Sequence, residues 1–134
     1  MTQTAWAHLP NAKHIDWAID SVKAHPEKWN AAWYATLRAT LNADLATRRN
    51  AATDAAYYAA TDAAYYTATD AAYYAARDAI LALIAYDDCA YMIESKVDEL
   101  KIIAKLGDQR AILLLPACIA YNETKELTNT SIAV

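Results

Sequence analysis

The sequence contains few residues that break a helix and almost none of the glycine on which many enzyme motifs depend. One glycine (Gly107), three prolines and no phenylalanine occur in 134 residues. Walker-type phosphate loops, dinucleotide-binding loops and the nucleophile elbow of hydrolases each require at least two glycines at close spacing. These three classes of site are therefore excluded for this sequence.

Other residues that commonly carry chemistry are scattered along the chain. The three histidines lack metal-ligand spacing, and no HExxH, CxxC or calcium-loop motif occurs. The two cysteines, Cys89 and Cys118, lie among apolar residues, and we expect them to be buried free thiols. We therefore expect no catalytic residues, no metal site and no cofactor, and a protein that is not an enzyme.

Long apolar runs are also missing. The best run, Ala111 to Ala120, is ten residues long and contains Pro116, whereas a membrane span needs about 20 residues. The N-terminus has no basic segment followed by an apolar one, so no secretory signal is expected. The formal net charge of -4 argues against binding to nucleic acids or anionic membranes. We expect a cytoplasmic protein without membrane association.

Alanine and tyrosine are abundant where these other residues are scarce. Alanine favours helices because it loses no side-chain entropy when it is ordered. No alternating run of β-branched residues between turn residues is present, so no strand is expected. The composition predicts an all-α fold, a helical bundle formed by a single domain over residues 1–134.

An eight-residue repeat occupies the centre of the chain. Three copies begin with Asp-Ala-Ala-Tyr-Tyr and cover residues 54–61, 62–69 and 70–77, and the phase extends back to residue 30 and on to residue 85. Eight residues advance about 80° around a helix, so the tyrosines wind around the axis. We expect an Ala/Tyr-rich central helix over 51–93, either continuous and about 65 Å long or broken. Because a helix that is apolar all round needs cover, we expect a homo-oligomer.

Two helices are expected within residues 1–50. Asn11 is a candidate N-cap of the first, which ends near Ala24, and Pro26 suits the first turn of the second. Trp6 lies before both helices. It either fixes the N-terminal segment to the body or forms an exposed anchor for a partner.

Short C-terminal helices are expected over residues 95–121, followed by a frayed polar tail over 122–134. Ser95 resembles the N-cap of a capping box, and Gly107 suits the position just after a helix end. Asp108 is the expected N-cap of the last helix.

The tyrosine pairs form the most informative candidate surface. Paired aromatic rings can stack a nucleotide or contact a protein, and the alternative is helix–helix packing. The aspartates of the repeat are expected on a solvated helix face. The tyrosines are Tyr57, Tyr58, Tyr65, Tyr66, Tyr73 and Tyr74, and the aspartates are Asp54, Asp62, Asp70 and Asp78.

Two acidic neighbours, Asp87 and Asp88, form a second candidate position. Their side chains point about 100° apart on a helix, so at most one can face a partly buried site. The alternative is an ion pair with a cation such as Arg110. Arg48 and Arg49 are candidate contacts for a phosphate group.

The runs NAAWYATLRATL, DAAYYAATDAAYY and ALIAYDDCAYM resemble alanine-rich octad-repeat proteins of bacteria and their phages, some of which are labelled immunity proteins. The resemblance covers about residues 30–120. In such proteins alternate copies carry Trp or Arg, whereas here Arg77 alone departs from the Tyr-rich pattern. The resemblance implies a small accessory protein that acts by binding, either as an immunity factor or as a phage inhibitor of a host system.

These observations favour a non-enzymatic inhibitor that binds a host or toxin protein and forms a homo-oligomer. One alternative is a sponge that holds a nucleotide signal between tyrosine-lined helices, and another is a purely structural helical assembly.

Overall fold

The computed structural model describes residues 5–36, 55–65 and 70–125, and these form an all-α fold, as the composition predicts. No strand occurs in these ranges, and none of their helices has the length and apolar character needed to cross a membrane. The elements in chain order are α1 (Ala12–Ala24), α2 (Pro26–Ala35), α5 (Ala55–Tyr65), α6 (Asp70–Ala85), the 3-10 helix η1 (Ala90–Glu94), α7 (Val97–Lys105) and α8 (Gln109–Thr124).

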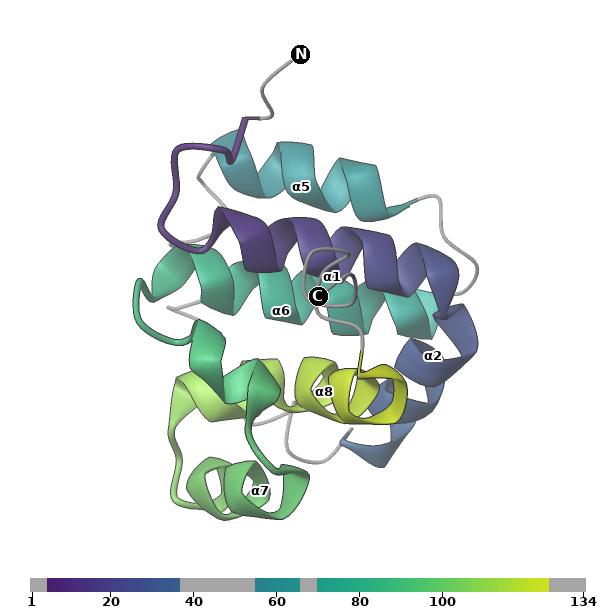
Figure 1. Cartoon of the computed structure of the whole chain (residues 1–134), viewed down its shortest axis with the longest axis vertical. Helices are drawn as coiled ribbons and strands as arrows, with labels where there is room; N and C mark the ends of the chain where they lie inside the picture. The colour runs from purple at the N-terminus through teal and green to yellow at the C-terminus, as the bar shows by residue number, and fades with distance from the viewer. Residues whose placement is uncertain (1–4, 37–54, 66–69, 126–134) are drawn as a thin grey trace.

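Helix α6 lies at the centre of the bundle. Helices α1, α2, α5 and α8 all pack against it, and Figure 1 shows α1 crossing in front of it, between α5 and α8. Its second half carries aliphatic side chains in place of tyrosines, and Ile80 and Leu83 are fully buried there. Residues 1–50, 51–93 and 95–121 therefore contribute helices to a common core.

The repeat does not form one long helix. Helix α5 ends at Tyr65, α6 begins at Asp70, and the two helices pack against each other. Helix α6 ends in turn at Ala85, and a turn at residues 87–88 separates it from η1. The broken arrangement is therefore the observed one, and the repeat helices cover part of each other's apolar surface within one chain.

Alanines, rather than tyrosines, form the buried side of both repeat helices. Residues spaced by four lie on one face of a helix, and the octad places alanine at that spacing. The single methyl group of alanine lets neighbouring helices approach closely. The buried positions are Ala56, Ala60 and Ala64 in α5, and Ala72, Ala76 and Ile80 at the equivalent positions in α6.

Helix α1 begins after Asn11, which holds the N-cap position as predicted, but its side chain does not cap the helix. The Asn11 side chain makes no capping hydrogen bond, and its Nδ2 instead donates to the carbonyl oxygens of Leu83 (3.0 Å) and Tyr86 (2.8 Å). Leu83 belongs to the last turn of α6, where backbone carbonyls lack intrahelical donors. Asn11 therefore joins the start of α1 to the end of α6.

Two of the three predicted features around the C-terminal helices are confirmed. Gly107 follows α7 with a φ of +93°, a left-handed conformation, and the Asp108 carboxylate accepts two backbone N–H bonds at the start of α8. Ser95 is not an N-cap, because Lys96 occupies that position and the Ser95 hydroxyl donates to a carbonyl of η1. Helix α8 continues to Thr124, beyond the expected end at residue 121.

The alanine packing predicts the effect of adding volume at Ala76. An Ala76→Leu substitution inserts three carbons into a fully buried helix contact, and we expect it to lower the free energy of unfolding by about 1–3 kcal/mol. Ala31→Leu, on the exposed side of α2, is the control and is expected to stay within about 0.5 kcal/mol of the wild type. Urea denaturation followed by circular dichroism measures both values. Equal effects at the two positions would contradict the close packing at Ala76.

Candidate functional site

Tyrosines from the first and third repeat copies gather near Arg77. Because α5 packs beside α6, Tyr57 lies close enough to Tyr73 and Arg77 for their charges to affect its ionisation. The rings of Tyr73 and Tyr74 are 5.9 Å apart between centroids. The guanidinium carbon of Arg77 lies 4.9 Å from the centroid of the Tyr74 ring, a cation–π contact. Two helices thus supply one mixed aromatic and cationic group.

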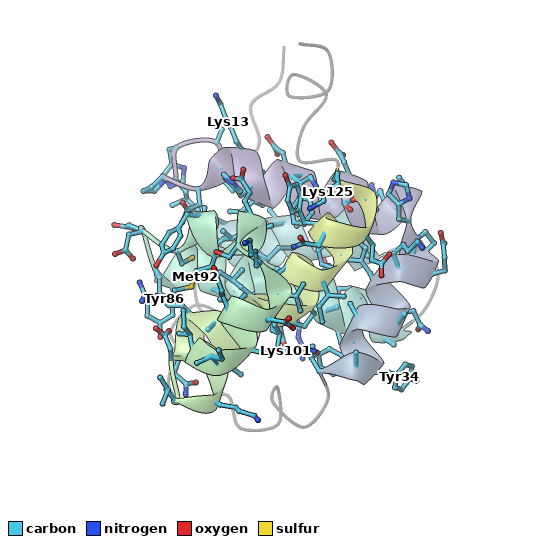
Figure 2. The ribbon with its side chains drawn as sticks, turned by 60° about the horizontal axis from the view of Figure 1, so that its bottom comes forward. Lys13, Tyr34, Tyr86, Met92, Lys101 and Lys125 are labelled. Carbon is cyan, nitrogen blue, oxygen red and sulfur yellow. The ribbon has the colours of Figure 1, made fainter. Side chains whose placement is uncertain are left out.

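Helix α2 adds two further aromatic side chains. The Trp33 ring lies 5.7 Å from the Tyr74 ring. Tyr34, the next residue, is 63% exposed and points away from the body of the protein (Figure 2). We refer to the whole set as the aromatic surface, which consists of Trp33, Tyr34, Tyr57, Tyr58, Tyr73, Tyr74 and Arg77.

Equivalent positions of the octad have equivalent environments in this surface. In the two pairs whose side chains the structure describes, Tyr57/Tyr58 and Tyr73/Tyr74, the first ring is half-buried and the second exposed, with Tyr58 at 59% and Tyr74 at 37%. Consecutive residues point about 100° apart on a helix, so only one member of a pair can face a neighbouring helix. The tyrosines are therefore neither a core layer nor a flat platform. They form a ridge whose inner rings pack and whose outer rings face solvent.

Trp33 and Tyr34 were absent from the candidates drawn from the sequence. The signal for them is the backward phase of the octad, because Trp33 and Tyr34 lie 24 residues, or three repeats, before Tyr57 and Tyr58. Their environments follow the same rule, with a half-buried first ring and an exposed second one. Helix α2 therefore presents the same type of face as the two helices of the repeat.

Burial raises the pKa of the Tyr57 phenol, while the positive charge of Arg77 acts in the opposite direction. The neighbouring Tyr73 and the carboxylate of Asp78 raise it further. The phenol is therefore protonated at neutral pH, and its hydroxyl remains a hydrogen-bond donor.

Asp78 lies beneath the aromatic surface, and its position corrects the expectation of a solvated face. Its side chain is fully buried, with Oδ1 3.4 Å from Nη2 of Arg77. Asp62, two octads earlier, is exposed as predicted because it lies on the peripheral helix α5. The side chains of Asp54 and Asp70 lie outside the described residues. Arg77 thus faces the aromatic rings with its charge balanced by a buried carboxylate.

Asp87 and Asp88 are both exposed and do not line a buried site. The predicted alternative, a pair with Arg110, is observed for Asp88, whose Oδ1 lies 3.4 Å from Nη1 of Arg110. Arg110 is held more closely by Asp108, at 3.0 Å, and its hydrogen bond lowers the pKa of the Asp108 carboxyl. Asp88, Asp108 and Arg110 therefore form a surface ion-pair group at the start of α8.

Both cysteines are buried free thiols, as predicted. The Cys89 Sγ lies 3.4 Å from the carbonyl oxygens of Ala82 and Tyr86, to which the thiol donates. Burial raises the pKa of Cys89 to about 12 and that of Cys118 to about 11. Both sulfurs are therefore protonated and weakly nucleophilic at neutral pH.

Trp6 is buried, and its Nε1 donates to Oδ1 of Asp16 at 2.8 Å. It fixes the N-terminal segment to α1, so the exposed-anchor alternative is wrong. The remaining candidates lie outside the residues whose side chains the structure describes; they are Tyr65, Tyr66, Arg48 and Arg49.

The burial of Asp78 predicts unequal effects at two equivalent positions of the octad. Asp78→Ala removes the carboxylate from a largely buried pair, and we expect a loss of about 3 kcal/mol in the free energy of unfolding. The matched control, Asp62→Ala, is exposed and is expected to change stability by less than about 0.5 kcal/mol. Chemical denaturation measures both. Similar losses for the two variants would show that Asp78 is not in a buried environment.

The raised thiol pKa values predict slow labelling of the folded protein. At about pH 8, raising the pKa of a thiol from 9 to 12 lowers its thiolate fraction roughly a thousandfold, and burial slows access further. We therefore expect Cys89 to react with a thiol-specific disulfide reagent at least a thousandfold more slowly in the folded chain than in guanidinium chloride. Rapid labelling of Cys89 under native conditions would contradict the structure.

No three His, Cys, Asp or Glu side chains in the described parts of the chain are close enough together to hold a metal ion. Comparisons with protein-family models, with curated proteins and with solved structures found no significant match to this chain.

Proposed function

We propose that this chain is a non-enzymatic binding protein that contacts another protein through its aromatic surface. The observation that supports this most is the exposure of Tyr34, Tyr58 and Tyr74, together with the contact between Tyr74 and Arg77. Tyrosine, tryptophan and arginine are enriched among residues that dominate the binding energy of protein interfaces. A tyrosine also buries a large area while few rotatable bonds are immobilised.

The surface is organised before a partner arrives. The Tyr74 ring is in contact with the ring of Trp33 on one side and with the guanidinium of Arg77 on another. The Tyr58 ring lies 5.5 Å from that of Tyr57. These contacts restrict the exposed rings on rigid helices, which lowers the entropy cost of binding. The geometry suits a protein partner with an apolar patch that offers hydrogen-bond acceptors to the phenol groups.

A protein partner fits this surface better than a nucleotide does. The charge of Arg77 is balanced by the buried Asp78 carboxylate, so the surface supplies little net attraction for a phosphate group. A nucleotide sponge would have to use Arg48 and Arg49, which lie outside the described residues. The proposed role follows the octad-repeat proteins that the chain resembles. In that role it inhibits a toxin or host defence protein, as an immunity factor or phage anti-defence factor, and acts as a homo-oligomer.

The proposal predicts that removing exposed rings weakens partner binding without unfolding the chain. A Tyr34→Ala/Tyr58→Ala variant loses two exposed rings, and we expect at least a thirtyfold loss of affinity, equivalent to about 2 kcal/mol. Stoichiometric capture of one bacterial protein by the tagged wild-type chain identifies the partner, and calorimetry with that protein measures the affinity.

Tyr91→Ala is the matched control, because Tyr91 is as exposed as Tyr58 but lies in η1, outside the aromatic surface. It is expected to bind the partner normally. Equal losses in both variants would contradict the assignment. A melting temperature that rises with nucleotide concentration would instead favour the sponge.

A further inference from the structure

Helix α7 carries an exposed apolar pair at the edge of the bundle. Ile102 is 62% exposed and Leu106, the residue directly after the helix, is 81% exposed. Residues four apart lie on the same helix face, so these two side chains are neighbours. Helix α7 packs chiefly against α8, and Figure 1 shows it at the opposite end of the molecule from α5. Its outer face therefore presents an aliphatic ridge to solvent.

Opposite charges lie on either side of Ile102 along this ridge. Glu99 lies three residues before Ile102 and Lys105 three residues after it, so the three side chains share one row of the helix surface. Both charged side chains are exposed. Among the described residues, no salt bridge involves either of them. The charge pattern is thus acidic on one side of Ile102 and basic on the other at equal spacing.

We propose that this face of α7 is a docking surface for a second copy of the chain, with the two α7 helices antiparallel and Ile102 on the two-fold axis. In this register, residues equally spaced before and after Ile102 face each other. Glu99 of each copy then lies opposite Lys105 of the other and Ile102 packs on its counterpart, while Leu106 lies at the edge of the contact, opposite Asp98 of the other copy. Such an isologous contact requires a self-complementary surface. The Glu99–Ile102–Lys105 row is self-complementary in this sense. Binding to an unrelated protein would not require self-complementarity.

The dimer is expected to be weak and sensitive to salt. One nine-residue helix offers less than the roughly 800 Å² per partner of a standard interface. Its two ion pairs lie at the rim, where dissolved ions screen them. The inference rests on the homo-oligomer part of the proposed function and leaves the aromatic surface, which α2, α5 and α6 form, free for another protein.

Charge reversal tests the pairing directly. Sedimentation velocity of the full chain, from micromolar to millimolar concentration, is expected to show a monomer–dimer equilibrium. Glu99→Lys alone and Lys105→Glu alone each place like charges opposite each other, and each is expected to weaken the dimer about tenfold or more. The double variant restores opposite charges, and its dimerisation constant is expected to return to within about threefold of the wild type.

Two further variants test the location of the interface. Ile102→Lys is expected to abolish the dimer, while Asp20→Lys/Lys23→Glu, an exposed charge reversal on α1, leaves it unchanged. Circular dichroism melting confirms that each variant is folded. A strictly monomeric wild type would overturn both this interface and the homo-oligomer part of the proposed function. A dimer that survives Ile102→Lys, or that the double reversal fails to restore, would overturn the α7 interface alone.

Discussion

Close contact between helices at alanine positions determines how the rest of this structure is arranged. Among the described helices, α1, α2, α5 and α8 pack against α6, and its alanines allow them to approach because each contributes only a methyl group at the contact. Bulky side chains of the octad cannot occupy the same space, so the tyrosines lie at the edges of the helix contacts. Because tyrosine carries a hydroxyl group, it is better suited than phenylalanine to a position that is partly exposed to solvent, and the chain contains no phenylalanine. The aromatic surface is thus a geometric consequence of an alanine core.

Differences between copies of the repeat matter more for the candidate site than their similarity. Thr61 and Arg77 occupy the same octad position, and so do Asp62 and Asp78. The Thr61 hydroxyl donates to the carbonyl of Tyr57, one turn earlier in its own helix, whereas Arg77 extends over the ring of Tyr74. The nearly identical local sequence makes both segments helical. Arg77 supplies the cation of an ion pair that Thr61 cannot supply in α5, and the central place of α6 in the bundle buries the carboxylate of that pair.

Features governed by local chemistry could be predicted from the sequence. The all-α class, the limits of α1, the left-handed Gly107 and the Asp108 cap all depend on residues within one turn of each other. The end of α5 could not be predicted, because no glycine or proline lies between Tyr65 and Asp70 to mark it. Packing of α5 against α6 and α1 offsets the continuous helix that local propensity favours.

Only part of the candidate site could be predicted from the sequence, because the rest depends on packing between helices. The tyrosine pairs stand out in the sequence, but their assembly with Trp33, Arg77 and buried Asp78 depends on contacts between three helices. Arg77 precedes Asp78 where Thr61 precedes Asp62, but the burial of the Asp78 side chain comes from the central place of α6 in the bundle. Trp6 likewise depends on a hydrogen bond to Asp16 on the next helix, and so its burial does not follow from its position in a loose segment.

The two hydrogen bonds from Asn11 connect the order of folding to the order of synthesis. Their acceptors, the carbonyl groups of Leu83 and Tyr86, lie 72 and 75 residues further along the chain. Ribosomes make the chain from its N-terminus, so neither hydrogen bond can form before its acceptor residue has been added. Contacts over such separations close slowly because a long loop must first be ordered. The start of α1 therefore stays without its two hydrogen bonds to the end of α6 until more than half of the chain has been made.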